Sequence, residues 1–390
     1  MKIFCFALFL LCLGCSNPNP KGPVGAATSI FLDNRRIEKM AELDTYISGL
    51  DWVPLETSRE AIIGNTPYQM AVCEERLFLL YTGINSSLAI FDLKTGRFVK
   101  KLIGTGSGPG EFSKITSFNI HRGRKIIEIV AGFERKMLEF DLDGNFKTEI
   151  FCEIPFTNMA NLPNGEKICY SQSQNKVFTG HPQDYELLSL GENLRFRAGI
   201  RPLEARHPVY LVSGYIFFPY GDSLRFLKPF CDTIFDVLPR GTVPRYIAHF
   251  KRGAVEQGFW DNPRLQGSRD EIFEQYHIPS LMPVFFENER LLFGVYQSDD
   301  LMTYHYLYDK KNKSVGHNFG RLWYKKWDIP LPPPLHISSE GLLFLLAPEE
   351  LKTLIEEHPD PLKVPAGLRR AIENARSSDN PFFLQVRFRN

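Results

Sequence analysis

The sequence predicts an all-β protein, a six-bladed β-propeller whose ring is closed by a strand from near the N-terminus. A unit of short apolar strands recurs six times along the 390 residues, its turns carry Asp and Gly, and no helices alternate with the strands. Repetition of this kind is typical of propellers rather than of parallel sheets. A long antiparallel sandwich is the main alternative, but sandwich domains hold about 100 residues, and no linkers divide this chain into several of them.

The first two units give the clearest evidence for a repeat. Residues 76–103 and 125–150 each contain three apolar strands, and a similar hairpin follows the second strand in both. Gly96 and Gly144 stand at matching places in these hairpins, where glycine readily adopts the positive φ that a tight turn requires. The later units are more divergent, and their first apolar strands begin near residues 166, 214, 290 and 341.

A strand at residues 52–56 precedes the first unit and has no unit of its own. We expect it to pair with the last strand of the chain, at residues 382–388, because a closed ring leaves no exposed strand edge there. Between the strands, residues 348–357 and 364–376 have the apolar spacing of amphipathic helices. The polar residues 254–277 suggest an inserted loop or helix, and the proline-rich residues 329–335 suggest an extended connector.

The N-terminus has the features of a bacterial export signal. Lys2 is followed by eleven apolar residues, too few for the ~20 that a membrane span needs. Gly14 and Cys15 then resemble a lipobox, although Cys12 replaces its usual leucine, and an ordinary signal cleaved near Gly14 is the alternative. The expected organisation is a signal peptide at 1–14, a lipidated Cys15 with a flexible tether at 15–40, and the propeller at 41–390.

The charge balance of the chain limits its possible functions. With 46 basic and 45 acidic residues, the net charge is +1, which gives no reason to expect nucleic-acid binding.

Four cysteines remain after the lipobox: Cys73, Cys152, Cys169 and Cys231. They are either buried thiols within strands or, in an oxidising compartment, partners in a disulfide such as Cys152 with Cys169.

Glu111 is the first candidate ligand-binding residue. It follows a glycine-rich stretch at 104–110 that fits neither the Walker pattern nor G-x-G-x-x-G, because Pro109 interrupts it. A tight crossing between blades explains the glycines. Glu111 then either hydrogen-bonds the loop backbone or contacts a ligand.

Four aromatic residues form the second group of candidates: Trp260, Trp323, Tyr324 and Trp327. Their neighbours in the sequence are polar, and aromatic faces in such places bind peptides and glycans. Packing within the loops is the alternative. No catalytic residues, metal ligands or cofactors are indicated, because the nine histidines form no H-x-H or H-E-x-x-H motif and no Gly-x-Ser-x-Gly elbow occurs.

Several motifs together resemble a known family. These are DWVPLET at 51–57, IGTGSGPGEF at 103–112, DTIF at 232–235 and NPFFL at 380–384. They are similar to motifs of six-bladed β-propeller lipoproteins from anaerobic gut Gram-negative bacteria, which are distant relatives of NHL-repeat propellers. Residues 326–330 depart from that pattern. The resemblance implies the fold and an envelope location, and it transfers no catalytic residue.

Three functions are compatible with these observations. The first is a binding or interaction module, attached to the membrane through its lipid, with an unknown protein, peptide or glycan partner. The others are an enzyme, a lyase or hydrolase with its site in the central channel, and a structural subunit of an outer-membrane complex. Because Ser16 and Asn17 lack both an inner-membrane retention Asp and an acidic surface-display run, we expect the outer membrane, facing the periplasm.

Replacing Cys15 with Ala tests the lipid anchor. Without the thiol no diacylglyceryl group can be attached, so the protein should be released from the membrane or remain as an unprocessed precursor. Fractionation of cells into membrane and soluble pools, with immunoblotting, measures this. A mature, membrane-bound Cys15→Ala variant would contradict the anchor.

Overall fold

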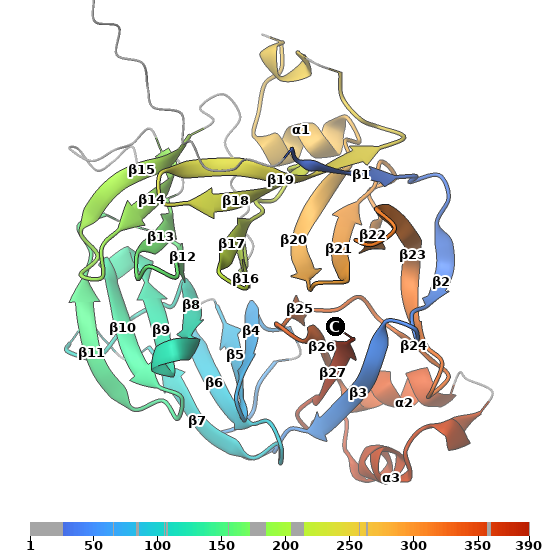
Figure 1. Ribbon diagram of the computed structural model, residues 1–390. Coiled ribbons are helices and arrows are strands. Elements are labelled where there is room, and N and C mark those ends of the chain that lie inside the picture. The colour runs from blue at the N-terminus through green and yellow to red at the C-terminus, as the bar shows by residue number, and fades with distance from the viewer. Residues whose placement is uncertain are drawn as a thin grey trace, which may run out of the picture.

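The computed structural model describes residues 26–64, 66–82, 86–104, 106, 108–154, 156–171, 185–203, 214–256, 258–262, 264–356 and 360–389. Residues 1–14 and Cys15 lie outside these ranges, so the export signal and its lipidation stay predictions. Six β-sheets stand around a common axis as the blades of a propeller (Figure 1). The predicted fold class is therefore confirmed.

Each blade is a mainly antiparallel sheet that runs from an inner strand near the axis to an outer strand at the rim. Blade 1 contains β4 (Gln69–Cys73), β5 (Arg76–Tyr81), β6 (Ser87–Asp92) and β7 (Phe98–Ile103). Blade 2 contains β8 (Ser117–His121), β9 (Ile126–Ala131), β10 (Lys136–Asp141) and β11 (Phe146–Phe151). Blade 3 contains β12 (Asn158–Asn161), β13 (Lys167–Tyr170), β14 (Tyr185–Leu190) and β15 (Phe196–Pro202).

The other three blades each include a strand from the N-terminal part of the chain. Blade 4 contains β16 (Phe217–Tyr220), β17 (Ser223–Phe226), β18 (Thr233–Leu238), β19 (Gly241–Phe250) and β1 (Thr28–Leu32). Blade 5 contains β20 (Ser280–Glu287), β21 (Leu291–Gln297), β22 (Thr303–Asp309), β23 (Ser314–Tyr324), β24 (Ile329–Leu331) and β2 (Glu38–Glu42). Blade 6 contains β25 (His336–Ile337), β26 (Gly341–Leu346), β27 (Phe382–Phe388) and β3 (Ile47–Pro54).

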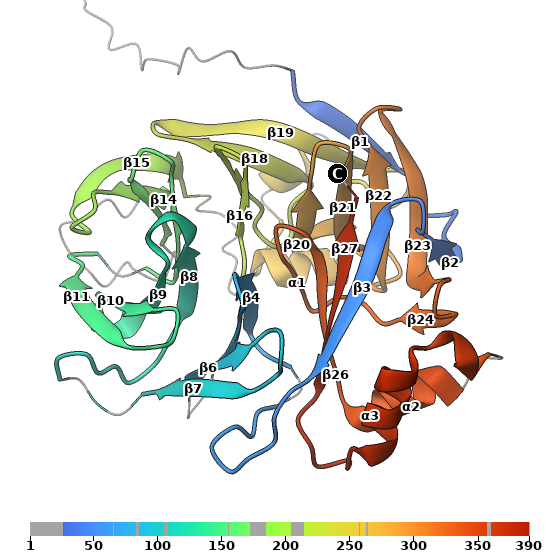
Figure 2. The ribbon, with the colours of Figure 1, turned by 60° about the horizontal axis from the view of Figure 1, so that its bottom comes forward.

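The ring is closed in blade 6, where chain segments from near the two ends pair. Strand β3 lies antiparallel to β27, with Pro54 opposite Phe382 and Ile47 opposite Phe388. The prediction that a strand near residue 52 completes the last blade is confirmed. Figure 2 shows β3 running along β27 from one face of the propeller to the other.

The N-terminal segment before β3 also belongs to the propeller, which corrects the expected tether at 15–40 and the boundary at residue 41. Strand β1 adds parallel to the outer strand β19, and β2 adds parallel to the outer strand β23. Ile30 and Leu32 of β1 are buried, while Phe31 between them is exposed and stacks on His249. This alternation is typical of a half-buried strand, so residues from Thr28 onward belong to the propeller.

The middle strands of the blades are apolar because both of their faces are covered by neighbouring blades. Every residue of β9 and of β26 is buried, whereas every residue of the outer strand β11 is exposed or half-buried. Burial on both faces explains why the sequence shows short continuous apolar runs there instead of alternation. The largest apolar cluster joins blades 5 and 6 and includes Phe293, Phe344 and Leu384.

In the ranges that the structure describes, three short α-helices lie outside the blades: α1 (Arg269–Gln275), α2 (Pro348–Glu356) and α3 (Ala366–Asn374). The chain also has 3₁₀ turns η1 (Arg122–Arg124), η2 (Gly132–Glu134), η4 (Phe259–Asp261) and η5 (Pro361–Lys363). Both helices expected after residue 348 are present, and α1 lies within the expected insertion, where Ser268 and Glu271 form a capping box. Within the described chain, no helix is long and apolar enough to cross a bilayer.

The cysteines settle the choice between thiols and a disulfide. Cys73, Cys152, Cys169 and Cys231 are all free and buried, so the alternative of a Cys152–Cys169 bridge is wrong. Burial raises the pKa of the Cys152 thiol to about 11. The thiols therefore act as small apolar side chains in the packing between strands.

A buried histidine makes the stability of the fold depend on pH. His305 on β22 lies between the rings of Phe293 and Phe319, with only 2% of its surface exposed. Burial lowers its pKa to about 4, from about 6.5 for a histidine in water, so the unfolded chain binds the proton more tightly. The stabilisation from the neutral ring is fully present above pH 6.5 and is lost as the pH falls toward 4.

Replacing His305 with Phe should therefore flatten the acid side of the stability profile, by roughly 3 kcal/mol between pH 7 and pH 4. Thermal unfolding followed across this range measures the effect. The control is His249→Phe, which removes an exposed histidine and should keep the wild-type profile. An unchanged acid dependence in His305→Phe would contradict this assignment.

Candidate functional site

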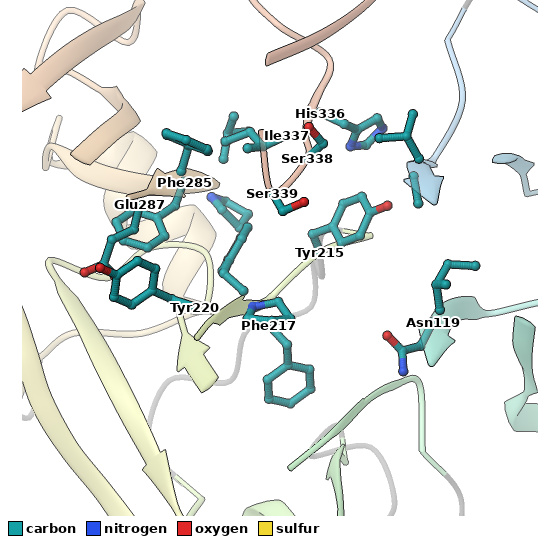
Figure 3. A pocket seen from close by; sticks show the side chains of 18 of the residues that line it. Asn119, Tyr215, Phe217, Tyr220, Phe285, Glu287, His336, Ile337, Ser338 and Ser339 are labelled. Carbon is teal, nitrogen blue, oxygen red and sulfur yellow. The ribbon is translucent and has the colours of Figure 1, made fainter. Parts of the chain in front are cut away.

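The inner strands enclose a cavity of about 160 Å³ on the axis of the propeller. Its lining comes from five of the six blades, through β4, β8, β16, β20, β25 and the residues next to them. Figure 3 shows side chains from these separate strands turned toward one space. The cavity therefore exists only because the ring brings distant parts of the sequence together.

The chain that leads into β16 contributes Tyr215 to the lining of this cavity and is hydrogen-bonded to other blades. The Gly214 carbonyl accepts hydrogen bonds from the side-chain amides of Gln69 and Asn158, and the latter measures 3.1 Å. The Tyr215 hydroxyl donates to the carbonyl of Met70. Gly214 and Tyr215 lead into blade 4 while Gln69 and Met70 belong to blade 1, so this segment crosses between the two blades beside the pocket.

A glycine is required at this crossing. A Cβ atom added to Gly214 would collide with the backbone carbonyl of Tyr68 and the side chain of Gln69. Gln69 is held at its other end, since its Oε1 accepts from the Phe118 amide at 2.8 Å. The crossing is thus tied to the first three blades by hydrogen bonds in a buried setting, where unpaired groups would be costly.

The walls of the pocket are mostly apolar. Partly exposed side chains of Ala71, Ile120, Phe218, Val284 and Ile337 face the space from five different strands or strand ends. A cavity of about 150 Å³ can hold a benzene-sized ligand, so this pocket has room for one ring or a short aliphatic chain. An apolar wall with a few fixed polar groups is the usual form of a small-ligand site.

Asn119 on β8 is a polar group whose orientation is fixed by a buried ionic network. Its Nδ2 donates to Glu128 Oε2 at 2.8 Å. Glu128 is fully buried and also accepts from Lys167 Nζ at 2.5 Å and from Asn161 Nδ2 at 2.6 Å. Since a carboxylate only accepts hydrogen bonds here, the Asn119 amide nitrogen must point to it, and the amide oxygen turns toward the cavity (Figure 3).

His336 on β25 is a second polar group in the lining. Burial lowers its pKa to about 4, so the ring is neutral near pH 7. Its Nε2 lies 3.3 Å from the carbonyl of Pro67 and must carry the proton of that hydrogen bond. Its ring also packs edge-on against Tyr215, with centroids 5.1 Å apart.

Two charged residues line the pocket away from the crossing. The exposed guanidinium of Arg122, in η1, donates to the carbonyl of Val72 at 2.9 Å. Glu287, at the end of β20, is bound by Arg225, Lys310 and the hydroxyl of Tyr246. Although burial opposes its ionisation, these hydrogen bonds and charges hold the pKa of Glu287 below its usual value.

This arrangement provides binding groups more readily than catalytic ones. The Glu287 carboxylate is occupied by its three partners, and His336 uses one nitrogen for the backbone. Within the described ranges, no group of three or more His, Cys, Asp or Glu side chains could hold a metal ion.

The structure places Glu111 away from the axial pocket, in the exposed crossing from blade 1 to blade 2. Its Oε2 accepts a hydrogen bond from the Gly108 amide at 3.2 Å. This is the loop-stabilising role considered from the sequence, and a Cβ at Gly106 would collide with the same carboxylate. A further ligand role for Glu111 stays a prediction.

The four aromatic candidates do not gather into one site. Trp260 belongs to the insertion, where it stacks on Phe273 at 5.5 Å and lies under the guanidinium of Arg269. Trp323 and Tyr324 lie on strand β23 rather than in a loop, and Tyr324 and Trp327 are only 4% exposed. Tyr324 and Trp327 pack edge-on in the blade 5 core, so they offer no open aromatic face.

Sequence reasoning missed the residues that do line the axis, including Asn119, Arg122, Tyr215 and His336. They stand at or beside the first strand of three different blades, and none forms a motif with its sequence neighbours. Only a prediction of which strand in each unit is innermost could have grouped them.

Comparison with known proteins gives a family and a fold. A profile described as a domain of unknown function, DUF4934, matches residues 29–387. The chain belongs to the DUF4934 family. The match begins at β1, in agreement with the place of β1 in the propeller. No curated protein matches the sequence.

Solved structures support the DUF4934 propeller. A Bacteroides fragilis protein described as exported is 20% identical, with a TM-score of 0.72 over 93% of this chain and 100% of that chain. A DUF4221 member from Bacteroides vulgatus is 11% identical, with a TM-score of 0.49 over 88% and 98% of the two chains. At such identities the first similarity shows the fold alone, and no site residue can be transferred.

Replacing Lys167 with Met tests the network that fixes Asn119 in this DUF4934 protein. It leaves the Glu128 carboxylate buried without its cation, which should destabilise the fold by about 3–5 kcal/mol. The matched control is the double variant Glu128→Gln with Lys167→Met, which removes both charges and should regain most of that loss. Urea unfolding measures both, and a single variant as stable as the wild type would contradict the role of the pair.

Proposed function

We propose that this protein is a non-enzymatic binding module outside the cytoplasm whose axial pocket takes a small ligand or one side chain of a partner. The observation that carries the proposal is the axial pocket itself, with walls from five blades and a volume of about 160 Å³. The few fixed polar groups inside, such as Asn119 and His336, would give a ligand an orientation.

The export part of the proposal is supported by two facts. The Bacteroides fragilis neighbour is described as an exported protein, and the chain begins with an apolar run that ends at Cys15. We propose that Cys15 carries the lipid and that the protein faces the periplasm from the outer membrane of a gut anaerobe. Strand β1 begins at Thr28, so a short segment joins that anchor to the rim of blade 4.

Binding is favoured over catalysis by the state of the ionisable groups around the pocket. A general acid or base must be within reach of the substrate and able to exchange a proton. The Glu287 carboxylate is instead fixed by Arg225 and Lys310, with O–N distances of 2.8 and 2.7 Å. His336 faces the cavity without an acidic partner among the described residues.

Filling the pocket tests the proposal. Ala71 lies on β4 and lines the cavity with a small side chain. Ala71→Trp should occupy the space and abolish ligand binding while the blades remain folded. Labelled wild-type and variant proteins are compared on peptide and glycan arrays, and circular dichroism confirms the β fold of both.

The matched control is Thr148→Trp, which adds the same side chain at an exposed position on the outer strand β11. It should bind as the wild type does. If no array ligand binds, or if Ala71→Trp binds every ligand as strongly as Thr148→Trp, the axial pocket is not the binding site and the proposal fails.

A further inference from the structure

Asn119 presents a hydrogen-bond acceptor to a ligand in the pocket, whose lining also includes the hydroxyl groups of Ser338 and Ser339. The amide oxygen of Asn119 faces the cavity because Glu128 holds the nitrogen on the opposite side at 2.8 Å. Among the residues that the structure describes, no donor reaches this oxygen. A bound molecule that buries it must therefore supply an N–H or O–H group, since an unpaired buried acceptor is costly.

His336, in blade 6, is a second hydrogen-bond acceptor that lacks a donor. Its Nε2 proton is used by the carbonyl of Pro67 at 3.3 Å, and the neutral ring then has an unprotonated Nδ1, which only accepts. Within the described part of the chain, Nδ1 receives no hydrogen bond. Two acceptors on β8 and β25 thus line one apolar space.

Arg122 adds a positive charge to the lining near the exposed turn η1. Its guanidinium donates one hydrogen bond to the carbonyl of Val72. No ion pair of Arg122 occurs within the described residues. The acidic residue of the lining, Glu287, is neutralised by Arg225 and Lys310. The uncompensated charge of the pocket is therefore positive, and it lies where a ligand would leave the apolar part.

The volume of the pocket and its apolar walls determine which molecular framework a ligand can have. About 160 Å³ has room for a single ring system, and the walls include Phe218, Pro219 and Pro283. Flat aromatic and proline surfaces pack well against another ring. A flexible aliphatic chain would also fit by volume, but it carries no donor for the two acceptors.

We infer that the axial pocket binds an aromatic ring that bears an N–H or O–H donor and is attached to a carboxylate, as in tyrosine or tryptophan. The ring enters the apolar space, the donor meets the oxygen of Asn119, and the carboxylate meets Arg122, three residues further along the chain. The same chemistry occurs in a free aromatic amino acid and in the C-terminal residue of a peptide. The inference rests on the proposed binding function and names the chemistry of its ligand.

Calorimetric titration of the folded protein with matched probes tests the donor and the carboxylate separately. N-acetyl-L-tyrosine should bind roughly fivefold to tenfold more tightly than N-acetyl-L-phenylalanine, which lacks one hydrogen bond. It should also bind about threefold to tenfold more tightly than N-acetyl-L-tyrosine amide, which lacks the charge. A short peptide ending in tyrosine distinguishes the sources, because tighter binding than the acetylated residue indicates a peptide end, and equal or weaker binding indicates the free compound.

Two variants connect these differences to the named residues. Arg122→Gln should remove the preference for the carboxylate and leave the preference for the hydroxyl. Asn119→Ala should reduce the preference for the hydroxyl and leave the preference for the carboxylate. Lys147→Gln, an exposed cation removed from the outer strand β11, is the control and should change neither.

The outcomes separate this inference from the proposed function. If pocket-dependent ligands are found on the arrays but tyrosine, phenylalanine and the amide bind equally or not at all, the inference is overturned and the binding function stands. If Ala71→Trp binds every ligand as strongly as the wild type, the proposed function itself is wrong. Discrimination by the wild-type protein that disappears in Arg122→Gln or Asn119→Ala supports the inference, and discrimination that survives in both overturns it.

Discussion

The pairing of β3 with β27 is the interaction on which the rest of this propeller depends. It joins a strand near the N-terminus to the last strand of the chain in one antiparallel register, from Pro54 opposite Phe382 to Ile47 opposite Phe388. Without it, blade 6 would expose the edge of β27 and the ring could open. The segment before β3 strengthens the closure, because β1 and β2 lie along the rims of blades 4 and 5 before the chain reaches blade 6 (Figure 1).

Neighbouring blades are held together in two physically different ways. Apolar clusters join neighbouring blades all around the ring, and buried ion pairs additionally join blades 2 to 3, 3 to 4 and 4 to 5: Glu128 with Lys167, Glu186 with Lys228, and Glu287 with Arg225. Apolar surfaces tolerate small slips between blades, but a buried ion pair is favourable only when its geometry is good. We therefore interpret these pairs as fixing the relative position of the blades, and the first of them also orients Asn119 in the pocket.

The sequence was sufficient to predict the propeller, its closure and the two helices after residue 348, because these follow from local patterns of apolar residues, turns and caps. It did not reveal that β1 and β2 belong to the rim, since single added strands have no unit around them. It also misjudged Trp327, whose polar sequence neighbours hide a side chain buried in blade 5. The sequence could not predict the residues that line the axis for a different reason. Asn119, Tyr215 and His336 come together only when the ring of blades forms.

The crossing at Gly214 connects the stability of the ring to the shape of the site. This backbone leads into blade 4, yet its hydrogen-bond partners Gln69 and Asn158 belong to blades 1 and 3. A change that separates these blades would break the crossing beside the pocket and admit more water to it. Water would then hydrogen-bond the acceptors on Asn119 and His336. A ligand that displaced this water would gain little binding free energy. Selective binding on the axis therefore requires the same closed ring that β3 and β27 maintain at the rim.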